Sequence, residues 1–81
     1  MQKILICDPD KLFRYNLGYV LESKGFVVQE ASRPSEAVKY VLKEEFGAVI
    51  FNMQLEDLNG AQIFSAIKAI DNKLPVIIVT D

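Results

Sequence analysis

Short apolar runs alternate with segments of helical period along this chain, and that alternation constrains its fold more than any other feature. Continuous apolar runs at residues 4–7, 26–28, 46–51 and 76–79 predict four buried strands. Between them the apolar spacing becomes helical and predicts three helices: after Asp10 as N-cap, from about Pro34, and after Asn59-Gly60. The order βαβαβαβ predicts an α/β fold in which helices cover both faces of a parallel sheet.

Each predicted helix has one apolar face that we expect to point inward. The first helix should end before Gly25, a good residue just past a helix end, although Gly18 in its middle weakens the prediction. The second helix should run to about Glu45. The predicted inward residues are Phe13, Leu17, Val20 and Leu21, then Ala37, Val38, Val41 and Leu42, then Ile63, Phe64, Ile67 and Ile70.

Three polar side chains follow the ends of two strands that we expect to be neighbours. Right-handed crossovers, with a reversal of winding after the first strand, give the strand order 2-1-3-4. The crevice of such a sheet lies at the carboxyl ends of strands one and three. Asp8 and Asp10 follow strand one and Asn52 follows strand three, so all three should open onto this crevice.

Composition excludes several classes of protein. The 81 residues predict one domain, 1–81, and an apolar fraction of 51% with 25% charged residues is typical of a globular chain. A net charge of −2 without a basic cluster argues against direct contact with nucleic acid. One cysteine and no histidine exclude a disulfide within the chain and a Cys/His zinc site. No run is long enough to span a membrane and no signal-peptide layout is visible, so we expect a cytoplasmic location.

Three stretches together resemble the receiver domain of two-component response regulators: "KILICDPD", "NMQLEDLNG" and "PVIIVTD". The resemblance covers the whole chain. It implies a flavodoxin-like open sheet, and it implies that this chain lacks the fifth strand and the last two helices of the family's usual domain. The 81 residues could also be a fragment of a longer protein.

The resemblance implies a site for phosphoryl transfer from a histidine kinase. The family places two adjacent acids after strand one to hold Mg²⁺, an acceptor aspartate after strand three, a hydroxyl after strand four and a lysine after strand five. Asp8 matches the first acid, but Pro9 stands in place of the second. Asn52 stands at the phosphoacceptor position, and Thr80 matches the switch hydroxyl. The lysine lies outside the chain, and Glu56 stands where the family usually has proline.

These departures predict a degenerate receiver. Asn52 is neutral and its amide oxygen is a poor nucleophile, and Pro9 offers no side-chain oxygen to a cation. We therefore expect no enzymatic activity, no cofactor, and weak or lost Mg²⁺ binding. The first hypothesis is a phosphorylation-independent signalling module. The alternatives are a working phosphoacceptor with substituted residues and a purely structural dimerisation domain.

Simpler interpretations exist for several acids and for the cysteine. Asp8 and Asp10 are an acidic pocket remnant by resemblance, but a loop acid and a helix cap explain them more simply than a cation site. Glu56 and Asp57 are more simply explained as residues of a solvated turn than as replacement ligands for a cation. Cys7, inside a strand, favours inert core over a reactive thiol.

The switch hydroxyl and the tyrosines also have simple interpretations. In the absence of a phosphoryl group to bind, Thr80 is more simply explained as a strand residue with an ordinary hydrogen bond than as a switch hydroxyl. Tyr15, Tyr19 and Tyr40 favour partial burial, with a partner surface as the alternative.

The predicted partners are proteins. An open edge on strand four would expose Val76, Ile77, Ile78 and Val79, so we expect self-association through this strand. The resemblance also implies a histidine kinase or an output domain, often a transcriptional one, as partners. No contact with a membrane is expected.

Overall fold

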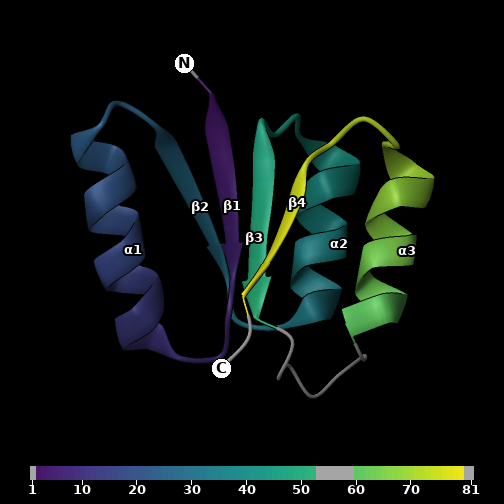
Figure 1. Cartoon of the computed structure of the whole chain (residues 1–81), viewed down its shortest axis with the longest axis horizontal. Helices are drawn as coiled ribbons and strands as arrows, with labels where there is room; N and C mark the ends of the chain where they lie inside the picture. The colour runs from purple at the N-terminus through teal and green to yellow at the C-terminus, as the bar shows by residue number, and fades with distance from the viewer. Residues whose placement is uncertain (1, 53–59, 80–81) are drawn as a thin grey trace.

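A computed structural model describes residues 2–52 and 60–79 of the chain (Figure 1). Within these residues, four strands and three helices alternate in the order that the apolar pattern predicts. The strands are β1 (Lys3–Cys7), β2 (Val27–Ala31), β3 (Ala48–Asn52) and β4 (Val76–Val79). The helices are α1 (Lys11–Ser23), α2 (Pro34–Lys43) and α3 (Gly60–Ile70).

The strands form one parallel sheet in the order β2-β1-β3-β4, which confirms the predicted topology. All four therefore end at the same edge of the sheet, with α1 on one side of it and α2 and α3 on the other (Figure 1). β1 is central and fully covered: its residues from Ile4 to Cys7 are all buried. Because side chains alternate along a strand, Leu5 and Cys7 face α2 and α3, and Ile4 and Ile6 face the α1 side.

The core lies between the sheet and the pair α2–α3. Its largest members, Leu5, Phe51, Ile63 and Ile67, are between 0% and 1% exposed. Each side chain buried this completely contributes roughly 1.5–3 kcal/mol of transfer free energy. Cys7 belongs to this cluster and is buried, which confirms the core interpretation of the cysteine.

Helix ends follow the predicted local chemistry. Asp10 is the N-cap of α1, and its carboxylate accepts hydrogen bonds from the N–H groups of Leu12 at 2.9 Å and Phe13 at 3.4 Å. Gly25 follows the helix with φ of +94°, a conformation that side chains rarely adopt. Gly18 is buried at the middle of α1, and a Cβ placed there would lie 3.6 Å from Val28.

Several predicted boundaries and inward positions are wrong. β2 begins at Val27 and continues to Ala31, because it is an edge strand whose polar Gln29 and Glu30 still pair with β1. β3 begins at Ala48, and the N–H of the preceding Gly47 donates a hydrogen bond to the carbonyl oxygen of Lys3 at 2.7 Å. α2 ends at Lys43. Four residues expected to point inward are at least 36% exposed, because they lie on the margins of the buried helix faces: Val20, Leu42, Phe64 and Ile70.

The tyrosines divide between exposure and partial burial. Tyr15 and Tyr19 on α1 are 66% and 60% exposed, so the expectation of partial burial is wrong for both. Tyr40 on α2 is half-buried and packs against the core cluster.

Candidate functional site

Asp8 directly follows β1 at the carboxyl edge of the sheet and is buried, with 2% exposure. Its N–H donates to the carbonyl of Ala31 at 3.0 Å, which extends the pairing of β1 with β2 by one residue. Its Oδ1 accepts the N–H of Asp10 at 2.8 Å. Its Oδ2 is buried and has no hydrogen-bond partner among residues 2–52 and 60–79. The site thus contains a buried carboxylate with one oxygen available to a ligand.

Asn52 is the last residue of β3 and lies beside Asp8 in the sheet register. Cys7 pairs with Phe51, so Asp8 and Asn52 each come one residue after the last paired positions of two neighbouring strands. Asn52 itself pairs with Val79 of β4 and is half-buried. The structure therefore brings together the acid and the amide that the sequence places at this edge.

Asp10 is near in sequence but serves a different part of the structure. Its exposed carboxylate caps α1, and its backbone N–H donates to Asp8 Oδ1. The helix-cap interpretation of Asp10 is confirmed. Within the described ranges no group of three acidic, histidine or cysteine side chains is arranged to hold a metal ion.

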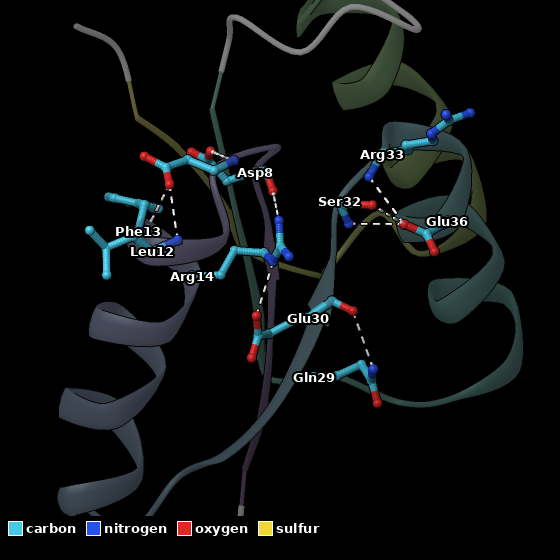
Figure 2. Close-up of polar contacts among 10 residues, drawn as sticks. Asp8, Leu12, Phe13, Arg14, Gln29, Glu30, Ser32, Arg33 and Glu36 are labelled. Carbon is cyan, nitrogen blue, oxygen red and sulfur yellow. Dashed lines mark hydrogen bonds and ion pairs between the residues drawn. The ribbon is translucent and has the colours of Figure 1, made fainter.

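Arg14 fixes the loop that carries Asp8, although it is not among the residues predicted for the site. Its Nη1 donates to the carbonyl oxygen of Asp8 at 2.6 Å, and its Nε donates to Glu30 Oε1 at 3.0 Å (Figure 2). The Arg14 side chain is 13% exposed and that of Glu30 is 44% exposed. One guanidinium thus joins α1, the β1–α1 loop and the end of β2.

A sequence signal for this arrangement existed. Arg14 lies one helical turn after the cap Asp10, so its side chain can reach back to the loop. Glu30 comes near the end of β2, which the predicted strand order places beside β1.

Glu36 organises the loop between β2 and α2, on the same edge of the sheet. Its Oε1 accepts hydrogen bonds from the hydroxyl and the N–H of Ser32, both at 2.9 Å, and from the N–H of Arg33 at 3.2 Å (Figure 2). The Ser32 hydroxyl and the backbone donors hold the pKa of Glu36 below its ordinary value. These contacts fix the start of α2 and involve none of the candidate phosphoacceptor residues.

The remaining predicted residues of the site lie outside the described part of the chain. These are Glu56 and Asp57 in the loop after β3, and Thr80 after β4. A separate hollow of about 220 Å³ is lined by Glu36, Lys39, Tyr40 and Lys43 of α2, and neither Asp8 nor Asn52 is among these residues.

The donor set at the edge of the sheet fits Mg²⁺ poorly. Mg²⁺ is usually held through one or two carboxylates together with the phosphate of a substrate. Asp8 offers one free carboxylate oxygen, but Pro9 has no side-chain oxygen and Asn52 offers at most a neutral amide oxygen.

Membrane crossing is a separate question. None of the three helices in residues 2–52 and 60–79 combines the length and the apolar character that a membrane span requires.

Comparisons with known proteins agree with this geometry. Residues 4–81 match the model of the response regulator receiver domain. Sporulation initiation phosphotransferase F of Bacillus subtilis is 32% identical over 98% of this chain and 64% of its own length. Transcriptional regulatory protein GlrR of Escherichia coli is 30% identical over 95% of this chain, which spans only 17% of that protein. A CheY-like receiver domain protein from Methanospirillum hungatei superposes with a TM-score of 0.95 at 25% identity, over 99% of this chain and 64% of its own.

Proposed function

This chain belongs to the response regulator receiver family of two-component signalling, and we propose that it signals without accepting a phosphoryl group. The observation that carries the proposal is Asn52 at the end of β3, beside the buried Asp8, with Pro9 in place of the second acid after β1. The nucleophile and the second acid expected of the family are replaced together in one site.

The chemistry of these replacements explains why transfer would fail. The acceptor expected of this family is an aspartate, whose negatively charged oxygen attacks the phosphorus, whereas the Asn52 side chain is a neutral amide and a poor nucleophile. The charge of a transferring phosphoryl group is normally balanced by a bound metal ion and positioned cations. Asp8 alone would hold Mg²⁺ weakly, because neither Pro9 nor Asn52 adds a second carboxylate, and the charge of the phosphoryl group would then stay unbalanced.

The proposed mode of action is binding to other proteins in the cytoplasm. A histidine kinase, an output domain or another copy of the chain would read the surface of the folded domain. The name of GlrR suggests transcriptional output for such a module. This chain spans only 17% of GlrR, so we propose a transcriptional output and do not carry it over from GlrR as a property of this chain.

Intact mass spectrometry tests phosphorylation independence directly. The 81-residue protein is incubated with Mg²⁺ and a small-molecule phosphodonor, beside a receiver that retains the acid pair and the aspartate. We expect the control receiver to gain the mass of one phosphoryl group and this chain to gain none. A stoichiometric gain at this chain would refute the proposal and favour the alternative of a working phosphoacceptor.

Self-association through the outer edge of β4 is the second part of the proposal. β4 is an edge strand of the described sheet, and its residues Ile77 and Ile78 are 52% and 39% exposed. No charged residue interrupts β4, whereas the opposite edge strand, β2, carries Glu30. Uninterrupted apolar edges pair readily with other strands, and a single charge suppresses such pairing.

Sedimentation of the 81-residue protein tests this association. We expect assemblies at tens of micromolar, and we expect the Ile77→Lys variant to lose the part of the association that runs through β4. A wild-type protein that sediments as a monomer at this concentration would contradict the proposal.

A further inference from the structure

Helix α1 is apolar on two opposite faces, although the sheet covers only one of them. The inner face, with Phe13, Leu17 and the buried Gly18, lies against β1 and β2. The outer face carries Leu12, Tyr15 and Tyr19, which are 66%, 66% and 60% exposed. A helix at the surface of a globular domain normally needs one apolar face, so the second one requires an explanation.

The three exposed side chains form a continuous stripe, which we call the α1 stripe. Leu12, Tyr15 and Tyr19 are spaced i, i+3 and i+7, the spacing of the contact seam in a pair of packed helices. Among the described residues no other element carries three large apolar side chains that are each at least 60% exposed. Tyrosine is also enriched at the buried centres of protein interfaces.

Two exposed charges flank the α1 stripe on the same side, at opposite ends. Lys11 and Glu22 are eleven residues apart, close to three full turns, so both lie along one line of the helix surface. In an antiparallel pair of identical helices, Lys11 of each copy faces Glu22 of the other. The two contacts are equivalent by the two-fold symmetry, which is the form an interface between identical chains takes.

We propose that α1 pairs in antiparallel fashion with α1 of a second copy of this chain. The α1 stripe forms the seam, and reciprocal Lys11–Glu22 ion pairs set the orientation. The outer position of α1 leaves this face accessible (Figure 1). This pairing uses a different surface from β4 and is independent of whether the domain accepts a phosphoryl group.

Charge reversal in the Ile77→Lys background tests the proposal, because that background removes association through β4. We expect the background protein to sediment as a dimer of twice the 9.1 kDa monomer mass. Lys11→Glu alone and Glu22→Lys alone place like charges at both contacts and should each weaken dimerisation by about tenfold. The double variant Lys11→Glu/Glu22→Lys restores opposite charges and should restore the dimer.

A matched pair of leucine variants tests the apolar seam. Leu12 on α1 and Leu42 on α2 are both 66% exposed. Leu12→Lys should abolish the dimer, whereas Leu42→Lys should leave it intact. Circular dichroism of each variant verifies that the fold is retained.

The outcomes separate the proposals. A monomeric Ile77→Lys background, or a dimer that Leu12→Lys and the single charge reversals leave unchanged, would overturn α1 pairing. Failure of the double reversal to rescue would also overturn the Lys11–Glu22 orientation. None of these results bears on the phosphoryl test, which is read from the mass of the protein.

Discussion

Replacing Asp8 by asparagine should make the protein more stable. The side chain of Asp8 is 2% exposed, and only Oδ1 has a hydrogen-bond partner among the described residues. Leaving a buried polar atom without a partner costs about 1–3 kcal/mol, and more when the group is charged. Asparagine keeps an oxygen that accepts the hydrogen bond of the Asp10 N–H. It replaces Oδ2, the carboxylate oxygen without a partner, by a neutral amide NH₂ group.

The expected gain is about 1 kcal/mol, because the amide N–H groups are then left partly unsatisfied. For a domain of this size, that free energy raises the melting temperature by roughly 4–8 °C. Asp8→Ala is the matched control: it removes the orphan oxygen but also the acceptor for Asp10, so its gain should be smaller. Urea unfolding and thermal melts are measured for all three proteins without Mg²⁺.

A melting temperature of Asp8→Asn below that of the wild type would refute this reasoning. Such a result would mean that the second oxygen of Asp8 is stabilised in the folded protein. The expected result would identify Asp8 as a residue that costs folding stability, as functional residues commonly do.

Substitutions at four further positions test other contacts of the structure. Asp10→Ala should lower the free energy of unfolding by about 1 kcal/mol through loss of the α1 cap, whereas Asp10→Asn should preserve it, as urea unfolding would show. Arg14→Lys should cost about 1–2 kcal/mol by the same measurement, because lysine lacks the fork that reaches Asp8 and Glu30 together. Gly18→Ala should gain about 0.5–1 kcal/mol in helix propensity, since its Cβ would meet Val28 at an ordinary contact distance of 3.6 Å; a loss would contradict this. Glu36 has a lowered pKa in the fold, so its contribution to stability is present above the ordinary glutamate pKa and is lost as the pH falls through the folded pKa; melts across acid pH should show a weaker decline for Glu36→Gln.

The sheet order was predictable from the sequence because parallel α/β topology follows from a few strong rules. Short apolar runs separated by helical periods leave few alternatives once crossovers are right-handed. Helix faces were less predictable. Val20 and Leu42 fit the helical spacing, yet they lie at the margins of faces that contact a narrow four-stranded sheet.

The candidate site was predictable as a set of positions but not as a set of contacts. The register of β1 and β3 places Asp8 beside Asn52, as the strand ends suggested. The spacing of Arg14 from Asp10 and the strand order place Arg14 and Glu30 near each other, but the hydrogen bond between them depends on how far the two side chains reach across two elements. The burial of Asp8 likewise depends on the packing around the end of β1.

The strand order β2-β1-β3-β4 bears on how the chain can fold as it is synthesised. β2 adds beside β1, β3 adds to the other side of β1, and β4 adds beside β3. When each described strand emerges from the ribosome, the strand that it pairs with has already been synthesised. None of them has to insert between two strands that are already paired. The chain can build its sheet outward from the amino terminus in the order of translation, which limits the time that apolar strands spend without a partner.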